Sequence, residues 1–377
     1  MNLKNYIGIK EIKLLMSGGL ASGGASVVMT TKGDLAGFDT VRNRIPIGTD
    51  AQVLTADSSE SLGIKWATGK VGGSDIYFGD GSDGDVTISS DTDLGSSNYK
   101  QYDNLTIDAG FSLTGDYGMV IKVKGTLAFG SGTSTINTNG KGGAGGTGTT
   151  YSGSGGNGGG YLYVFANTIT GTGKIQANGE DGNNATGYPS SGSAGGTNGT
   201  GGYNNNSLDD PTKGLAGNGN AGGGSGGGAY GAGGTGGREG GGTIAGGSAY
   251  TTTPITTLYN STTYGAGGGG GMEAYYFGGS QGASGGGGGS GGLLILISSN
   301  CSAITVEAVG GAGGNGSGLD NKGGGGGGGS GGEIIIMISG NNSITSDVSG
   351  GAKGIGVGNS NVGSTAGTNG VVSTWKI

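Results

Sequence analysis

Histidine is absent from this chain, and proline, cysteine and charged side chains are scarce. The 377 residues include four prolines and one cysteine, Cys301, and 11% of them are charged, with a formal net charge of −7. One cysteine cannot form an intrachain disulfide, and without histidine no imidazole can activate it as a nucleophile. A nucleic-acid groove needs clustered Lys and Arg, which a chain of this charge lacks. The composition therefore excludes an internal disulfide framework and disfavours both thiol catalysis and nucleic-acid binding.

Long apolar runs are also missing. The longest uninterrupted aliphatic run, Leu293 to Ile297, is far shorter than the ~20 residues that span a bilayer. Residues 1–13 scatter lysine and glutamate through the region where a signal peptide needs an apolar core. We therefore expect no membrane span and no cleaved secretion signal.

Glycine is what the chain has in excess, with 104 residues. So much glycine is typical of a flexible linker, of collagen, or of stacked polyglycine helices in the extended left-handed form. Collagen needs glycine at every third position and abundant proline, whereas this chain runs through consecutive glycines from Gly323 to Gly329. A disordered linker is the ordinary expectation for any single tract.

An internal repeat indicates that the glycine tracts, taken together, are not a disordered linker. Four apolar runs open on glycine, and each is followed by a polar turn, a β-branched stretch and then glycine again. The runs begin at Gly118, Gly160, Gly292 and Gly332, and the β-branched stretches are centred on Ile136, Ile175, Ile304 and Ile344. Repeats too short to bury a face alone must stack on their neighbours to share a core.

Ordered glycine must recover a large loss of backbone entropy from dense contacts. A polyproline-II-type glycine helix has no internal hydrogen bonds, so its amides point outward and can pair with neighbouring helices. At about 3.1 Å per residue, seven glycines span about 22 Å, similar to a six- or seven-residue strand. The sequence thus predicts an all-β fold in which strands and polyglycine-II helices lie side by side.

Three strings near the N-terminus carry a resemblance. They are Thr30-Thr-Lys-Gly-Asp-Leu, Arg44-Ile-Pro-Ile-Gly-Thr-Asp-Ala-Gln-Val-Leu-Thr-Ala-Asp-Ser-Ser and Gly63-Ile-Lys-Trp66. Together they resemble a module of tail-fibre and other structural proteins of bacterial and archaeal viruses. The resemblance implies a small β element of a fibre, commonly trimeric. Ala51 stands where glycine is usual in that module, and the stretch from Gly33 to Gly37 is short.

The alternation of glycine tracts and apolar strands is similar to the polyglycine-sandwich tip adhesins of T-even-like phage tail fibres. In that family, loops at the end of the sandwich touch the host receptor. We accordingly expect an attachment segment at 1–28, a β fibre module at 29–72, a short β-solenoid at 73–140, and a glycine-rich sandwich with inserted recognition loops at 141–377.

Aromatic residues in the polar insertion between the second and third apolar runs are the candidate receptor contacts. Tyrosine among Ser, Gly, Asn and Thr offers a large rigid contact area at low entropy cost, which suits an adaptable recognition surface. Packing of these rings on glycine-helix edges is the alternative for any one of them. The candidates lie in segments 184–212 and 247–264 and just beyond: Tyr188, Tyr203, Tyr259, Tyr264, Tyr275, Tyr276 and Phe277.

Acidic residues suggest two further sites. Asp80, Asp83 and Asp85 lie in a glycine-containing loop that would suit calcium, although the closing glutamate of an EF-hand is missing and a simple turn would explain them equally. No other cofactor is indicated. The adjacent acids Glu180 and Asp181, or Asp209 and Asp210, could form a glycosidase pair only across a sugar-sized groove, and in polar loops they are usually solvated turns.

The sequence favours a non-enzymatic virion fibre or fibre-tip protein that displays loops to a receptor on the host surface, a glycan or an outer-surface protein. Residues 1–28 would bind other virion proteins, and the copies would form a homotrimer. A cellular surface filament or adhesin is the main alternative, and a polysaccharide depolymerase a lesser one. An ice-binding protein would need a regular threonine face, whereas threonine here clusters irregularly, as at residues 251–253.

Overall fold

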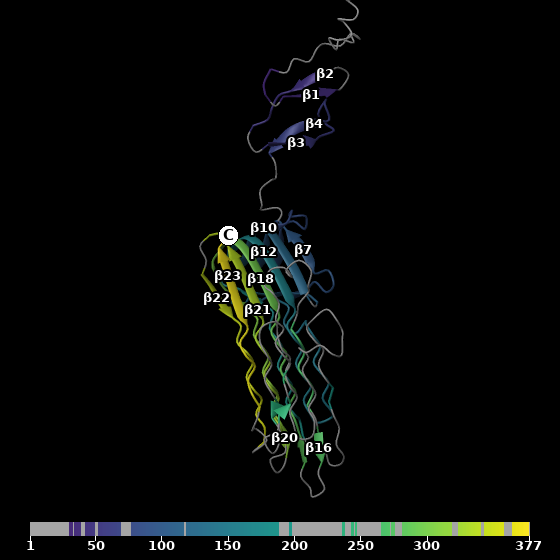
Figure 1. The fold of residues 1–377 in the computed structure, drawn as a ribbon, viewed down its shortest axis with the longest axis vertical. Helices are drawn as coiled ribbons and strands as arrows, with labels where there is room; N and C mark the ends of the chain where they lie inside the picture. The colour runs from purple at the N-terminus through teal and green to yellow at the C-terminus, as the bar shows by residue number, and fades with distance from the viewer. Residues whose placement is uncertain are drawn as a thin grey trace, which may run out of the picture. The chain divides into compact units, whose positions relative to one another are not determined.

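The structure of the chain is a computed structural model. It describes residues 30–32, 34–38, 42–49, 52–68, 77–116, 118–187, 196–197, 236–237, 243–244, 246, 265–271, 273–275, 281–318, 323–340, 343–357 and 364–376. The chain divides into two compact units, Met1–Gly73 and Ser74–Ile377. The elements in the described ranges are all β-strands (Figure 1), which confirms the prediction of a mostly β protein. No helix in these ranges is long and apolar enough to cross a membrane.

The described residues of the first unit form two antiparallel hairpins. Strand β1 (Leu35–Phe38) pairs with β2 (Arg42–Ile45), and β3 (Gln52–Ala56) pairs with β4 (Ile64–Thr68).

Three hydrogen bonds join the three strings that carry the resemblance. Asp34 accepts a hydrogen bond from Arg44 Nε at 2.6 Å and another from the Ile47 amide at 3.1 Å. The Trp66 indole donates to the Pro46 carbonyl oxygen at 2.6 Å. The polar and aromatic residues of the strings therefore hold one small folded element together.

Two parallel sheets form the upper part of the second unit in Figure 1. The eight-stranded sheet has the order β23-β21-β18-β12-β10-β8-β5, with β7 also paired to β10, and the six-stranded sheet has the order β22-β19-β13-β11-β9-β6. The strands of the first are β5 (Val86–Ile88), β7 (Tyr99–Tyr102), β8 (Leu105–Ile107), β10 (Gly118–Phe129), β12 (Tyr161–Thr170), β18 (Leu293–Cys301), β21 (Glu333–Ile338) and β23 (Val371–Lys376). Those of the second are β6 (Thr92–Asp93), β9 (Ser112–Thr114), β11 (Thr135–Asn137), β13 (Lys174–Gln176), β19 (Ala303–Glu307) and β22 (Ser343–Asp347).

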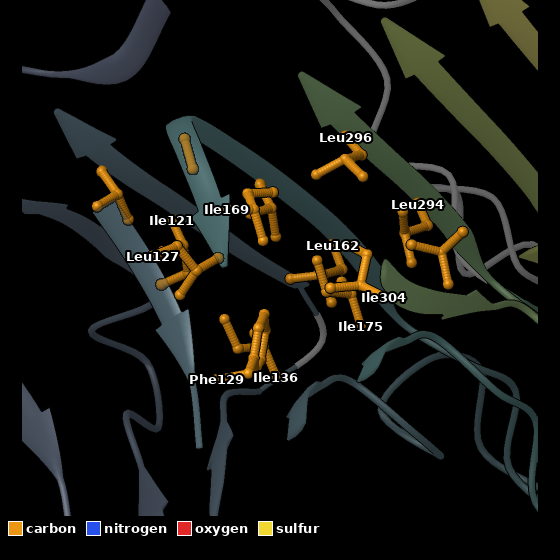
Figure 2. Close-up of a cluster of buried hydrophobic side chains, with 14 of the residues drawn as sticks. Ile121, Leu127, Phe129, Ile136, Leu162, Ile169, Ile175, Leu294, Leu296 and Ile304 are labelled. Carbon is orange, nitrogen blue, oxygen red and sulfur yellow. The ribbon is translucent and has the colours of Figure 1, made fainter. Parts of the chain in front are cut away.

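The hydrophobic core lies between these two sheets. Along each strand every second side chain points inward, because successive Cβ atoms alternate between the faces of a sheet. In the larger sheet Leu162, Leu294 and Ile334 occupy equivalent register positions, and all three are fully buried. Figure 2 shows Ile136, Ile175 and Ile304 of the smaller sheet on the facing wall. The β-branched stretches of the repeat thus supply the second wall of the core.

One backbone hydrogen bond recurs at the base of each repeat. The glycine that precedes a strand of the larger sheet donates to the residue that follows a strand of the smaller sheet. These pairs are Gly160 to Thr138, Gly292 to Ala177, Gly332 to Ala308 and Gly370 to Val348, with distances of 2.7–2.8 Å. The start of one strand is therefore level with the end of the other, so the strands of the two sheets run in opposite directions.

Glycine tracts extend from the ends of the strands. The described tracts are 138–148, 152–160, 177–187, 265–271, 284–292, 308–316, 323–332, 348–357 and 364–370. They run below the two sheets in Figure 1, side by side. Their amides donate to carbonyl oxygens of neighbouring tracts, as at Gly143 to Gly265 (2.7 Å) and Gly313 to Ala352 (2.8 Å).

Tract 284–292 shows that the bonding has a period of three residues. Its amides donate in rotation to tract 323–332, tract 177–187 and tract 265–271. The donor and acceptor pairs are Gly285 to Gly324, Gly288 to Gly327 and Gly291 to Ser330; then Gly286 to Asn183 and Gly289 to Glu180; then Gly287 to Gly269 and Ser290 to Ala266, all at 2.8–3.0 Å. A backbone that faces the same neighbour at every third residue has three distinct sides.

Side chains follow the same period. In tract 308–316 the residues Val309, Ala312 and Asn315 are spaced three apart. A Cβ on the intervening Gly310 or Gly313 would lie 2.1 Å from a carbonyl oxygen of tract 323–332. One side of this tract therefore accepts a side chain, and the side that faces its neighbour does not.

The segments 73–140 and 141–377, which the sequence separates into a solenoid and a sandwich, share both sheets. Strand β10 pairs with β12 over Gly118–Ala128, and β11 pairs with β13. Their hydrophobic residues belong to one cluster, which includes Leu105, Ile136 and Ile334.

Replacing a glycine inside the array should destabilise the protein. In Gly326→Ala the new Cβ would lie 2.0 Å from the Gly286 carbonyl oxygen, so the tracts must move apart. We expect the free energy of unfolding to fall by about 1–3 kcal/mol, as for other overpacked interiors. The matched control is Gly132→Ala, whose Cβ would meet its nearest neighbour, Thr172 O, at 3.4 Å. Equal stability of both variants in denaturant titrations would contradict the packing described here.

Acid should loosen the first unit. The Arg44 guanidinium and the amides of Thr31, Thr30 and Ile47 hold the pKa of Asp34 well below its usual range. This stabilisation is fully present above the unfolded pKa of about 3.9 and is lost as the pH falls through the lower folded value. We expect amide exchange at Ile47, measured by NMR, to stay slow at pH 5 and to accelerate only in stronger acid. In Asp34→Asn, the Ile47 amide should exchange faster at pH 5 as well; unchanged exchange would contradict this role.

Candidate recognition site

Most of the aromatic residues predicted to bind a receptor lie outside the described residues. These are Tyr188, Tyr203, Tyr259, Tyr264, Tyr276 and Phe277. Tyr275 is the last residue of strand β16 (Glu273–Tyr275), and its backbone pairs with Gln281 in β17 (Gln281–Ala283).

A small antiparallel sheet stands at the end of the glycine tracts. Strand β17 pairs with β16 on one side and with β20 (Ser317–Gly318) on the other. Figure 1 places β16 and β20 at the end of the tracts that is farthest from the two large sheets. We call this end the tip. The β16–β17 hairpin that holds Tyr275 is therefore fixed at the tip by two glycine tracts, 265–271 before it and 284–292 after it.

Tyr151, which the sequence analysis did not single out, also belongs to the tip. It lies in the turn between tracts 138–148 and 152–160 and is 37% exposed. Its carbonyl oxygen accepts the Thr186 amide at 2.9 Å, and its ring packs over Gly187. A tyrosine in a turn between two glycine tracts was the sequence signal for this position.

Hydrogen bonds connect the turn around Tyr151 to a neighbouring tract. The Thr149 amide donates to Ser152 Oγ at 2.6 Å, and that hydroxyl donates to the Gly271 carbonyl oxygen at 2.9 Å. Gly271 is the last described residue of tract 265–271 before strand β16. The turn and the base of the tip hairpin are therefore tied together.

Parts of the long insertion are also described. Gly196 and Thr197 lie beside tract 138–148, where three hydrogen bonds join Thr147 and Thr197. The Thr197 amide donates to Thr147 O at 2.9 Å, the Thr147 amide donates to Thr197 Oγ1 at 2.8 Å, and the two hydroxyl groups are 3.0 Å apart. The Gly270 amide donates to Thr197 O at 2.9 Å. Two short strands, β14 (Gly236–Gly237) and β15 (Thr243–Ile244), pair antiparallel. The insertion thus contacts the array at Thr197.

The segment 184–212, predicted as a recognition loop, begins inside the array. Asn184, Ala185 and Thr186 belong to tract 177–187, and the Ala185 amide donates to Asn315 O at 2.8 Å. Asn184 Oδ1 accepts the Asn315 amide at 2.7 Å. Residues 184–187 therefore hold neighbouring tracts together.

Glu180 and Asp181 are placed in the same tract and not in a polar loop. Glu180 accepts a hydrogen bond from the Asn157 side chain at 2.8 Å, and Asp181 accepts the Ala312 amide at 2.7 Å. Each carboxylate thus binds a different neighbouring tract. Asp209 and Asp210 lie outside the described residues.

The three aspartates considered for calcium bind separate partners. Asp80 accepts the Ser82 amide at 2.9 Å, Asp83 accepts the Gln101 amide at 2.6 Å, and Asp85 accepts the Asn104 side-chain amide at 2.9 Å. The hydrogen bonds from Ser82 lower the pKa of Asp80. Across the ranges that the structure describes, no three Asp, Glu or Cys side chains gather closely enough to hold a metal ion. Asp80 thus shapes a local turn, whereas Asp83 and Asp85 bond to Gln101 and Asn104, which are distant in the sequence.

Comparison with known proteins identifies no relative. No protein-family model matches the chain, and neither the curated proteins nor the solved structures contain a match.

Cys301 lies far from the tip, at the end of β18, and is buried. Burial raises the pKa of its thiol to about 12, so almost no thiolate forms at neutral pH. We expect iodoacetamide to leave the native protein unmodified at pH 8 and to alkylate it fully in guanidinium chloride, as read by intact mass. Rapid labelling of the native chain would contradict the packing of β18 against the core.

Proposed function

We propose that this chain is a virion fibre or fibre-tip protein that displays recognition loops on a rigid scaffold. The observation that carries the proposal is the array of glycine tracts with a period of three residues. It supports a structure that does not bend between the large sheets and the tip. The mechanism is display without catalysis, in which several shallow contacts are multiplied by the number of copies on the particle.

The tracts are best interpreted as polyglycine-II helices. An extended left-handed helix with three residues per turn has no internal hydrogen bonds, so its amides must find partners on neighbouring helices. The rotation of donors in tract 284–292 among three neighbours fits this geometry. Each repeat places one strand in each of the two parallel sheets. In this interpretation the stacked repeats form a two-sided β-solenoid, and the glycine tracts run below it.

The tip supplies the place for recognition. Chain turns gather there. Tyr151 is exposed in one turn, and the backbone of Tyr275 belongs to the β16–β17 hairpin. The tyrosine-rich insertion departs from the same end, because it follows Gly187, which packs against Tyr151. Turns on a rigid support are where binding residues concentrate in many folds.

The proposed partners are a receptor on the surface of the host cell and other proteins of the particle. Residues 1–28 would attach the chain to the particle, and the module at 29–72 would join copies as a trimer, as its resemblance implies. A cellular surface filament or adhesin would use the same scaffold. For a bacterial host, intact mass of native material separates the two. A viral fibre from such a host should carry no glycan, whereas a cellular protein would be open to glycosylation at sequons such as that of Asn260.

Cell binding tests the recognition role. The fluorescently labelled full chain is incubated with a panel of intact bacterial and archaeal strains, and retained fluorescence is measured by flow cytometry. We expect retention on a few strains only. Replacing the seven predicted aromatic residues, Tyr188, Tyr203, Tyr259, Tyr264, Tyr275, Tyr276 and Phe277, with alanine should reduce retention by at least about tenfold, as expected when aromatic hot spots are lost.

The matched control removes aromatic rings elsewhere. Tyr77 and Tyr99 are 49% and 53% exposed and belong to the part of the unit that holds the large sheets. The double variant Tyr77→Ala, Tyr99→Ala should bind as the unchanged chain does. Equal loss in both variants, or no retention on any strain, would overturn the proposal.

A further inference from the structure

The two sheets end unevenly at the C-terminal side of the repeat stack. The larger sheet ends at β23 and the smaller at β22, so the last strand of the larger sheet has no strand of the smaller sheet opposite it among the described residues. Val372 shows the consequence. It occupies the register position of Ile334 and Leu294, which are fully buried, yet it is 36% exposed. One strand position is therefore vacant, beside β22 and facing Val372.

Within the described ranges, the glycine array also ends on this side, at tract 348–357. In tract 308–316, the amides of Gly310, Gly313 and Gly316 donate to backbone carbonyls of tract 348–357. In tract 348–357 the residue equivalent to Gly310 is Gly350. Its amide donates to the Asn369 side chain at 3.1 Å and not to a backbone carbonyl of a further tract. A side-chain oxygen thus stands where the carbonyl of a further tract would be.

From the uneven ends of the two sheets we infer that two copies of the chain pair edge to edge through their C-terminal strands. The copies would be related by a two-fold axis parallel to the strands. This rotation places the larger sheet of one copy in the same layer as the smaller sheet of the other. Strand β23 of each copy then occupies the vacant position beside β22 of the other copy. Because the axis is parallel to the strands, the sheets of the two copies lie at the same height along it, and so do their glycine tracts. The Val372 side chains of the two copies would then meet at the axis.

The register of this pairing follows from a contact within the single chain. The Gly370 amide donates to Val348 O at 2.7 Å, so these residues are level. The strands of the two sheets run in opposite directions, which puts Val371 level with Asp347 and Ser373 level with Thr345. An antiparallel pair results. Val372 would lie beside Ser346, and Thr374 beside Ile344. All four side chains face inward, so the alternation of inward and outward side chains matches between the two strands.

The charges at this edge also permit the pairing. Asp347 would lie opposite Val371, and Lys353 opposite Thr365 by the same register. These pairs bring no two like charges directly opposite each other, an arrangement that destabilises strand pairs.

The opposite end of the stack does not offer a matching edge. There the sheets end in the short strands β5 and β6, and in the sequence no glycine tract follows any strand between β5 and β11. A copy placed head to tail would pair its strands but bring no glycine tract to the outer side of tracts 348–357 and 364–370. Pairing of C-terminal edges extends the sheets and the tracts together, and it closes after two copies.

Cysteine trapping tests the pairing in the full chain. Thr345→Cys with Ser373→Cys places thiols on directly opposed residues of the two copies, within the roughly 4.4–6.8 Å of Cα separation that disulfides span. Under copper–phenanthroline oxidation we expect a disulfide-linked dimer on non-reducing gels, about tenfold more abundant than in either single variant, because the geometry suits the bond. A second pair, Asp347→Cys with Val371→Cys, should give the same result.

The control pair is shifted by one residue. Thr345→Cys with Thr374→Cys points the two thiols to opposite faces of the joined sheet, and should form little dimer. Val372→Asp added to the first pair should abolish the cross-link, because two carboxylates would meet at the axis. Absence of dimer in both matched pairs, or equal dimer in the shifted pair, would overturn the inference. The contact uses residues 343–376 alone, so cell binding and any trimer through 29–72 are tested separately.

Discussion

Every buried glycine amide in this protein needs a hydrogen-bond partner outside its own segment. Tracts 265–271 and 284–292 are buried throughout, and a buried unpaired amide costs about 1–3 kcal/mol. Ordering a glycine costs a further ~0.5–1 kcal/mol relative to alanine. A single hydrogen bond contributes a net of about 0.5–1.5 kcal/mol. The array is therefore stable only when nearly all of its amides are paired at once, which requires several tracts held in parallel register.

The two β-sheets provide that register. Every described tract except 265–271 is continuous with a strand whose side chains are fixed in the core. The recurring bond from Gly160, Gly292, Gly332 and Gly370 sets the height at which these tracts leave the sheets. Tract 265–271 is held by its bonds to tracts 138–148, 152–160 and 284–292. A one-residue slip of a strand would turn its apolar residues outward. The same slip would move every amide of the tract to a different neighbour, since the bonding has a period of three. Hydrophobic alternation in the sheets thus specifies hydrogen bonding in a region that has almost no side chains.

Sequence patterns predicted the strands well, whereas pairing between distant segments could not be inferred from them. The apolar runs from Gly118, Gly160, Gly292 and Gly332 and the stretches centred on Ile136, Ile175, Ile304 and Ile344 are strands, because their alternation and β-branching are local signals. Strands β10 and β12 lie on either side of residue 140 and pair in one sheet. That pairing joins distant segments of the chain, so composition does not reveal it. Likewise Glu180 and Asn184 look like loop residues by type, yet the side chain of Glu180 bonds to Asn157 and that of Asn184 bonds to tract 308–316.

Sequence variation in such a scaffold is restricted by position within the period of three. In tract 308–316 the side of Gly310 and Gly313 admits no Cβ, whereas the side of Val309, Ala312 and Asn315 carries side chains of different size and polarity. Turns between tracts have neither constraint, and the chain carries Tyr151 and the β16–β17 hairpin there. An insertion at a turn disturbs no amide pairing inside the array, because the tract before it already ends. The geometry that makes the array rigid therefore directs chemical diversity to the tip, the end at which the proposed recognition takes place.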